Sequence, residues 1–301
     1  MESLPLVFTR SEALAAGLTD KALRGPRVQR VLRGTYVSAG VELDARVRAL
    51  AALRLAPTGS VAARATAAVL LGAVVPHDTR VHLRMPAGQL RLPGVDARVR
   101  RGRRPHALVR GIPVTTAEDT FVDLTAELDL VDLVVLGDSL VRRGRTSPER
   151  LVAVAARLRG RHARLARRAA GFVRAGVDSP MESRLRMLLV LAGLPEPAVN
   201  HIECDEWGRW LRRYDLSWPE LRVAVEYDGR QHAESQRQWE RDVERREELD
   251  LDGWRIVVVL SKGVYREPER TLDRVVAALR ARGVRARVTS DEWRLHFLGR
   301  G

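Results

Sequence analysis

The alternation of apolar and polar residues along the first part of the chain predicts short elements in the order helix, helix, strand, strand. Thr9-Arg10-Ser11-Glu12 has the form of a helix capping box. Thr19 begins a second short helix, which Gly25-Pro26 ends. The segment Val28–Val37 then predicts a β-hairpin. This order is typical of a winged helix-turn-helix, which we predict for residues 1–58.

In such a domain the second helix enters the major groove of DNA. Lys21 and Arg24 lie near the front of that helix, and three further arginines follow in and around the hairpin. The predicted DNA-binding residues are therefore Lys21, Arg24, Arg27, Arg30 and Arg33. The alternative is a small helical cap whose arginines are only solvated.

The middle of the chain mixes helical and strand patterns and predicts a small α/β domain over residues 59–145. The segment SVAARATAAVLLGA predicts a helix capped by Ser60, and RVHLRMP predicts a strand. Asp119 and Asp123 lie one helical turn apart. We interpret this pair as structural, in capping or salt bridges, rather than as catalytic acids.

Residues 146–178 predict a basic helical connector. Ser147-Pro148-Glu149 begins a helix, and apolar residues recur after it at helical spacing. The stretch from 142 to 178 holds 11 arginines but only two acids, Glu149 and Asp178. Such a surface tracks a DNA backbone or is simply solvated, and the sequence leaves both interpretations open.

The last part of the chain, residues 179–301, opens with Ser179-Pro180 and Glu182, the pattern of a second capping box. Glu182 therefore has a structural explanation as a capping acid. Strands then follow up to residue 216 and over 222–228, a helix over about 234–249, a strand over 254–260 and a helix over about 268–281. This gives the order αββαβα.

Acidic residues lie on the first two of these strands. The alternation of residues predicts two faces on either side of a turn at Pro219-Glu220. One face is apolar and holds Tyr214, Leu216, Trp218, Val223, Val225 and Tyr227. The opposite face holds Asp215, Ala224, Glu226 and Asp228. With a four-residue turn, Asp215 lies directly across from Glu226.

Clustered carboxylates destabilise a sheet unless a cation offsets their repulsion. Oxygen ligands suit Mg²⁺, so we predict a metal site of Asp215, Glu226 and Asp228. A solvent-facing polar strand surface is the alternative.

The same residues resemble a known family. Asp215, Glu226-Tyr227-Asp228-Gly229 with His232, Arg241-Asp242 and Gly253-Trp254-Arg255 are similar to the uncharacterised family related to very-short-patch-repair endonucleases, within the PD-(D/E)xK, restriction-endonuclease-like superfamily. The resemblance covers about residues 179–283. It implies hydrolysis of DNA phosphodiester bonds with Mg²⁺ or Mn²⁺ as cofactor.

The resemblance also implies roles for individual residues. Asp215 and Glu226 would hold the ion, and His232 would act as general base or contact the phosphate. Asp228 would be a third ligand or orient His232. Glu182 matches a helix acid found near such sites. The superfamily signature usually has a lysine at the position of Asp228, and Lys262 is a candidate substitute.

The N-terminal part, FTRSEALAAGLTDKALRG with VQRVLRGTYV, resembles the winged-helix domain of abortive-infection-type (AbiE-like) antitoxins and related regulators over about residues 5–145. Together the two resemblances imply an α+β multi-domain protein that joins a winged helix-turn-helix and a small α/β domain to a restriction-endonuclease-like core.

The length of 301 residues suggests two or three domains, and the apolar runs are too short for a membrane span. The net charge of +14 lies entirely in residues 1–178, with 30 Lys and Arg against 16 Asp and Glu, whereas residues 179–301 hold 22 of each. A compositional bias toward arginine explains why arginine outnumbers lysine, but not why the excess charge is confined to residues 1–178. We therefore expect the first part to bind DNA.

Other chemistries lack their motifs, because the chain has no P-loop, no Gly-x-Ser-x-Gly elbow and no two-histidine metalloprotease helix. A single cysteine, Cys204, excludes a disulfide framework. We expect a protein that is located in the cytoplasm, where it could associate with the nucleoid, and that has no membrane partner. The sequence does not determine the oligomeric state, and a homodimer is one alternative.

The leading interpretation is a DNA-binding protein with a metal-dependent endonuclease domain. The first alternative is a non-enzymatic transcriptional regulator or antitoxin-like protein with an inactive nuclease fold. An RNA-acting nuclease is the weaker alternative, because single-strand recognition uses exposed aromatic residues and the few aromatics here lie mostly at predicted core positions.

Overall fold

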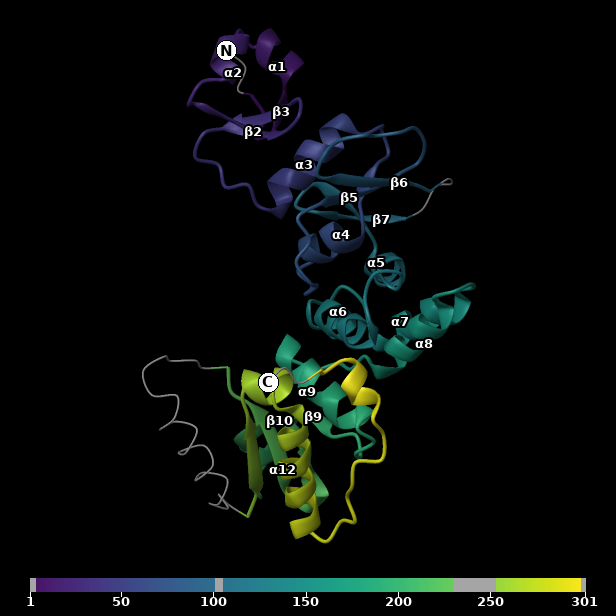
Figure 1. Ribbon diagram of the computed structural model, residues 1–301. Coiled ribbons are helices and arrows are strands. Elements are labelled where there is room, and N and C mark those ends of the chain that lie inside the picture. Colours follow the sequence, from purple (N-terminus) through teal and green to yellow (C-terminus); the bar gives the residue numbers. More distant parts are fainter. Residues whose placement is uncertain (1–3, 101–104, 230–252, 299–301) are drawn as a thin grey trace. The chain divides into compact units, whose positions relative to one another are not determined.

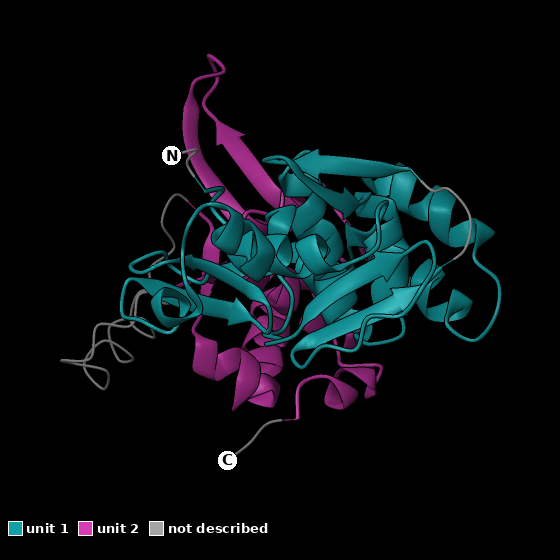
Figure 2. Ribbon diagram, turned by 90° about the horizontal axis from the view of Figure 1, so that it is seen from above, with its two compact units in different colours: residues 1–171 teal, residues 172–301 magenta. Residues whose placement is uncertain are grey.

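A computed structural model describes residues 4–100, 105–229 and 253–298. The chain divides into two compact units, Met1–Gly171 and Phe172–Gly301 (Figures 1 and 2). No helix in the described ranges is long and apolar enough to cross a membrane. The finer division into four parts stays a prediction.

Unit 1 begins with two short helices and a small antiparallel sheet in the order β1-β3-β2. The predicted capping box is confirmed: the Thr9 side chain accepts from the Glu12 N–H, and the Glu12 carboxylate accepts from the Thr9 N–H at 2.8 Å. The hairpin is confirmed too. The elements are β1 (Phe8–Thr9), α1 (Arg10–Ala15), α2 (Asp20–Leu23), β2 (Val28–Leu32) and β3 (Thr35–Ser38).

The predicted second helix, α2, has only four residues, about one turn. The sequence pattern did not predict β1, which has two residues and pairs with β3 through Phe8 and Tyr36. Phe8 is buried with Ala13 and Leu23, so this sheet and both helices share one small core.

The rest of unit 1 surrounds a five-stranded mixed sheet in the order β6-β5-β4-β8-β7 (Figure 1). All five residues of β5 are buried, as expected for a central strand. The elements are α3 (Ala45–Leu55), β4 (Val61–Ala62), α4 (Arg64–Leu70), β5 (Val81–Met85), β6 (Val95–Val99), β7 (His106–Val109), β8 (Ile112–Thr115), α5 (Ala117–Leu124) and α6 (Leu130–Arg142).

The predicted cap at Ser60 is wrong. Val61–Ala62 form strand β4, and helix α4 begins only at Arg64 with Ala63 at its cap position and no side-chain cap. The Ser60 hydroxyl donates to the Pro57 carbonyl oxygen instead, at 2.6 Å. Pairing of β4 with β5 and β8 overrides the helical preference of this alanine-rich segment.

The structural interpretation of Asp119 and Asp123 is confirmed. The buried guanidinium of Arg84 on β5 bridges both acids on α5, with Nη1 2.6 Å from Asp119 and Nη2 2.7 Å from Asp123. The predicted connector also forms helices, α7 (Pro148–Arg157), capped by Ser147, and α8 (Ala163–Phe172).

Unit 2 has a four-stranded sheet in the order β12-β11-β10-β9, and α9 and α12 both contact β11. The turn after β10 has the predicted four residues, so Trp218 pairs with Val223. The predicted helix over 234–249 lies outside the described residues. The elements are α9 (Pro180–Leu191), β9 (Ala198–Cys204), β10 (Trp210–Trp218), the 3-10 helix η1 (Pro219–Leu221), β11 (Val223–Tyr227), β12 (Arg255–Val259), α11 (Ser261–Tyr265), α12 (Pro268–Ala281) and the 3-10 helix η2 (Glu292–Leu295).

Strand β9 was not predicted. It pairs antiparallel with β10, and the two form an arm that extends from the rest of unit 2 (Figure 2). Trp207 and Trp210 at its tip are 70% and 65% exposed. These two aromatic residues therefore do not lie in a core.

Candidate active site

Three predicted acids come from three different elements of unit 2. Glu182 lies in the first turn of α9, Asp215 on β10 and Glu226 on β11. The Asp215 carboxylate interacts electrostatically with both other carboxylates. The sheet and the helix packed on it thus place Asp215 between two like charges.

Asp215 is fixed by the backbone of the neighbouring strand. Its Oδ2 accepts a hydrogen bond from the Tyr227 N–H at 2.9 Å. Main-chain pairing between β10 and β11 runs from Leu216, opposite Val225, to Trp218. At Asp215, just beyond this pairing, the side chain accepts the hydrogen bond from β11 instead. This hydrogen bond to the sheet backbone therefore fixes the orientation of the Asp215 carboxylate.

The predicted alternation of faces is partly wrong at this point. Tyr214 and Ala224, expected on opposite faces, belong to one buried cluster with Trp254 and Ile256. Because regular β10–β11 pairing is confined to 216–218, strict alternation between the two strands is not maintained beyond Leu216.

Glu182 begins its helix as predicted, with a difference in the reciprocal bond. The Ser179 hydroxyl accepts from the Glu182 N–H at 3.1 Å, whereas the Glu182 carboxylate accepts from the Asp178 N–H at 2.9 Å, one residue before the cap. Glu182 is only 7% exposed. A capping acid is normally solvated, so its burial next to Asp215 needs a further reason.

Burial raises the pKa of the Glu182 carboxyl, and the charges of Asp215 and Asp178 raise it further against the hydrogen bonds to the capping segment. Burial also raises the pKa of Asp215, with Glu226 and Asp178 acting in the same direction. Like charges in a low-dielectric site oppose each other's ionisation. A cation at this position would relieve that opposition.

Cationic side chains border the acids. Arg212 Nη2 lies 3.3 Å from Glu226 and its guanidinium lies 5.3 Å from the centre of the Tyr214 ring. Arg213 Nη2 lies 2.5 Å from Asp178. Lys262, the predicted substitute lysine, forms a 2.8 Å ion pair with Glu267. Arg212 was not predicted as a site residue, although it lies two residues before Tyr214 on the strand that carries Asp215.

A second group of contacts holds β10 in place. Tyr214 stacks on Trp254 with ring centres 4.1 Å apart. The Tyr214 hydroxyl donates to Glu203 Oε2 at 2.9 Å, and Trp254 Nε1–H donates to Oε1 at 2.8 Å. Strands β9, β10 and β12 are thereby joined next to Glu226.

The carboxylate donors fit Mg²⁺ or Mn²⁺ in their chemistry, because both ions prefer oxygen ligands. Within the described ranges, no three His, Cys, Asp or Glu side chains are arranged as a group that could hold an ion. Asp228 follows β11 directly and donates its N–H to the Val259 carbonyl oxygen at 3.0 Å. His232 lies outside the described residues.

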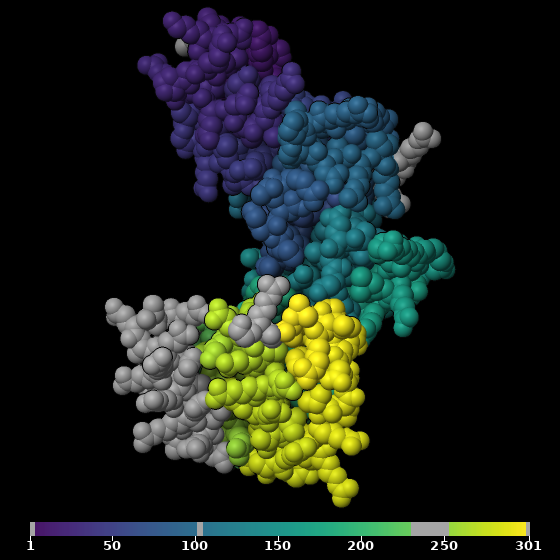
Figure 3. All heavy atoms as spheres, in the orientation of Figure 1, coloured from purple at the N-terminus to yellow at the C-terminus, as the bar shows by residue number. Residues whose placement is uncertain are grey.

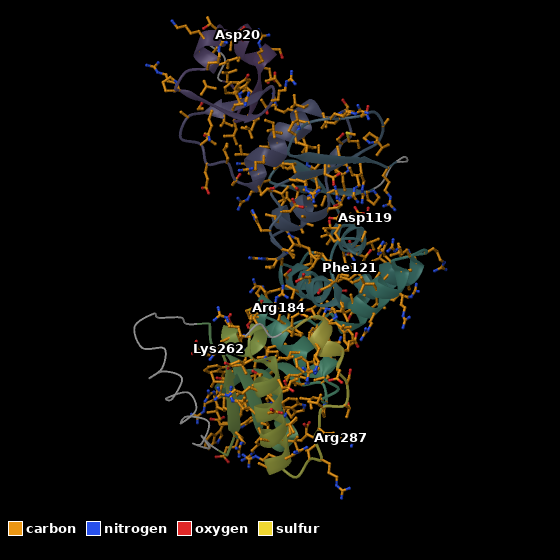
Figure 4. All side chains as sticks on the ribbon, in the orientation of Figure 1. Asp20, Asp119, Phe121, Arg184, Lys262 and Arg287 are labelled. Atoms are coloured by element: carbon orange, nitrogen blue, oxygen red, sulfur yellow. The ribbon has the colours of Figure 1, made fainter. Side chains whose placement is uncertain are left out.

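The predicted DNA-binding residues all lie in the N-terminal part of unit 1 and are all exposed: Lys21, Arg24, Arg27, Arg30 and Arg33. Arg24 Nε–H donates to the Asp20 carbonyl oxygen at 3.3 Å, which closes the end of α2. The Asp20 carboxylate itself pairs with Arg10 at 2.6 Å (Figure 4).

A family model described as REase_MTES_1575, restriction endonuclease-like, matches residues 212–279. This range holds Asp215, Glu226, Asp228 and His232, and it excludes Glu182. The match supports a nuclease-like C-terminal domain.

Two curated relatives are similar over most of the chain. They are the uncharacterized proteins MT2308 and Rv2248 of two Mycobacterium tuberculosis strains, CDC 1551 and H37Rv. Each is 29% identical over 263 residues, which is 86% of this chain and 95% of the relative. Among solved structures, that of the RV2827C protein from Mycobacterium tuberculosis is 22% identical, with a TM-score of 0.40, and covers 65% of this chain and 78% of its own.

Proposed function

We propose that the protein is a DNA-binding, metal-dependent endonuclease that hydrolyses phosphodiester bonds through its C-terminal domain. The observation that carries this proposal is the electrostatic contact of Asp215 with Glu182 and Glu226, within or next to the restriction endonuclease-like segment. Buried acids with raised pKa values, here Glu182 and Asp215, are more common at functional sites than in purely structural positions.

In this proposal Asp215 and Glu226 hold Mg²⁺ or Mn²⁺, with Asp228 as a third ligand. When bound, such an ion activates water and offsets the charge that develops on the phosphate. The Tyr227 N–H keeps the Asp215 carboxylate oriented, and Arg212 forms a 3.3 Å ion pair with Glu226. Glu182 adds negative charge from α9, and His232 is the proposed general base.

The proposed DNA contacts are Lys21, Arg24, Arg27, Arg30 and Arg33 in the N-terminal part of the chain. They are exposed and belong to the unit that carries the excess positive charge. Phosphate contacts of this kind position the duplex, and the hydrolytic site acts on it. Without hydrolytic activity, the same contacts would serve the non-enzymatic regulator.

A single-stranded substrate is the second candidate. Trp207 and Trp210 are exposed on the β9–β10 arm, and Arg209 lies 4.8 Å from the Trp207 ring centre. Exposed aromatic rings with a nearby guanidinium are typical surfaces for stacking bases of single-stranded DNA or RNA. The observation removes the reason for which an RNA substrate was disfavoured.

One experiment tests the proposal and ranks the substrates. The full-length protein is incubated with equal nucleotide concentrations of duplex DNA, single-stranded DNA and RNA, each with Mg²⁺, Mn²⁺ or EDTA. We expect metal-dependent cleavage of duplex DNA. Faster cleavage of either single strand would favour the second candidate. Salt-sensitive duplex binding without cleavage of any substrate would favour the regulator.

A further inference from the structure

The junction of α7 and α8 carries a group of arginines, which we call the junction surface and define as Arg157, Arg159, Arg161, Arg164 and Arg167. All five are exposed. Figure 3 shows the segment of α7 and α8 at the edge of unit 1. The buried residues of α8 are the small side chains Ala163, Ala166, Ala169 and Ala170, whereas Arg164 and Arg167 on the same helix are exposed.

No acid neutralises these charges locally in the sequence. Residues 150–177 contain no Asp or Glu but eight arginines. In the described part of the chain, Arg159 and Arg167 donate hydrogen bonds to main-chain oxygens. One of these joins Arg167 Nη1 to the Leu158 carbonyl oxygen at 3.3 Å. By contrast, Arg150 at the start of α7 pairs with Glu118 at 3.0 Å.

The arrangement has an electrostatic cost in the free protein. Arg164 lies in the first turn of α8, which contains no acidic residue, and the positive end of a helix dipole disfavours a cation there. Several like charges within two turns repel one another, although salt screens part of that repulsion. Neither folding nor solubility requires this density on one projection.

We propose that the junction surface binds the phosphate backbone of a nucleic acid. Arginine suits phosphate because its planar guanidinium donates two parallel hydrogen bonds. Arg164 and Arg167 lie one turn apart on α8 and so can contact successive phosphates along a strand. The inference deepens the proposed function, since it assigns a backbone contact that is separate from the hairpin arginines and from the carboxylates.

The test measures the affinity of the full-length protein for a duplex DNA fragment at several salt concentrations. EDTA is present, so binding is read without hydrolysis. The test variant is Arg161→Ala/Arg164→Ala/Arg167→Ala. The control, Arg285→Ala/Arg287→Ala/Arg294→Ala, removes the same charge from exposed positions of unit 2; Arg287 extends away from that unit in Figure 4. A third variant replaces the same junction arginines by lysine.

We expect the test variant to bind more weakly and its plot of log affinity against log salt to be less steep by about 2–3, since each phosphate contact contributes roughly 0.9. The control should keep the slope of the unchanged protein, and the lysine variant should keep most of it.

An unchanged slope in the test variant, an equal loss in the control, or no duplex binding by the unchanged protein at low salt would each overturn the inference. Failure of cleavage would not affect this result, because binding is measured in EDTA. Conversely, loss of the junction contact would leave metal-dependent cleavage at low salt in place, so the two proposals fail separately.

Discussion

Asp215 is the residue on which the functional account depends most. Its carboxylate accepts a hydrogen bond from a backbone N–H of the next strand and interacts electrostatically with Glu226 and Glu182. The sequence predicted its position opposite Glu226, because a four-residue turn fixes the register of a hairpin. It could not predict the bond to Tyr227, because nothing in the alternation marks the point where main-chain pairing ends.

Replacing Asp215 by asparagine should change the pH dependence of stability in EDTA. The pKa of Asp215 is raised in the folded state, so the folded protein binds this proton more tightly than the unfolded chain does. The free energy of unfolding therefore decreases as pH rises through the interval between the unfolded value, about 4, and the folded pKa. Asparagine keeps an acceptor for the Tyr227 N–H but has no charge.

Thermal unfolding of both proteins from pH 4 to pH 8 measures this effect. The melting temperature of Asp215→Asn, relative to that of the unchanged protein, should rise with pH. A difference in melting temperature between the two proteins that stays constant from pH 4 to pH 8 would contradict a raised pKa of Asp215 in the folded state.

Adding Mg²⁺ should reverse the order. An ion that binds only the folded state stabilises it by about 2.7 kcal/mol at 100 times its dissociation constant. We expect Mg²⁺ or Mn²⁺ to raise the melting temperature of the unchanged protein at pH 8 and to leave that of Asp215→Asn nearly constant. Equal shifts in both proteins would place the ion elsewhere.

At the scale of elements, local signals in the sequence were informative and long-range ones were not. Helix starts at Thr9, Ser147 and Ser179 were predicted, because capping involves residues within one turn. Strands β4 and β9 were missed. Two-residue β4 exists only through pairing with distant strands, and the outer half of β9 carries mixed polar and apolar residues that show no clear period.

The Arg84 bridge between β5 and α5 should be a main determinant of the stability of unit 1. Arg84→Ala leaves Asp119 and Asp123 partly buried without their shared cation, and loss of one partner of a buried ion pair costs about 3–5 kcal/mol. Urea unfolding gives the free-energy difference. Arg150→Ala, which removes an exposed partner of Glu118, should cost less than about 1 kcal/mol. Equal losses of unfolding free energy in the two variants would mean that the buried Arg84 bridge stabilises unit 1 no more than the exposed Arg150 pair does.

The β9–β10 arm gives a prediction that separates stability from binding. Trp207 is mostly exposed, so Trp207→Ala should change the free energy of unfolding by less than about 0.5 kcal/mol. If bases stack on the arm, the same variant should lose about 1–3 kcal/mol of affinity for single-stranded DNA. Anisotropy titrations with a labelled oligonucleotide measure this, with Trp254→Phe as a variant of the buried tryptophan. Unchanged affinity in Trp207→Ala would exclude stacking on this side chain.

At the scale of the whole molecule, the charge distribution and the division of the chain agree in outline. The excess positive charge belongs to the first 178 residues, and the two compact units meet at Gly171 and Phe172. The nuclease-like character of residues 212–279 was predictable, because Asp215, Glu226 and Asp228 and the residues around them resemble a known endonuclease-like family. Its metal dependence was a chemical inference from those acids, and it remains the central proposal.

The most direct test of that proposal is nicking of supercoiled plasmid by the purified full-length protein with Mg²⁺ or EDTA. It compares the unchanged protein with Asp215→Asn and with Asp273→Asn, a matched change at an exposed acid on α12. The account predicts nicking that needs the metal, persists in Asp273→Asn and is lost in Asp215→Asn. Metal-dependent nicking that survives in Asp215→Asn would contradict the assignment of Asp215 to the active site.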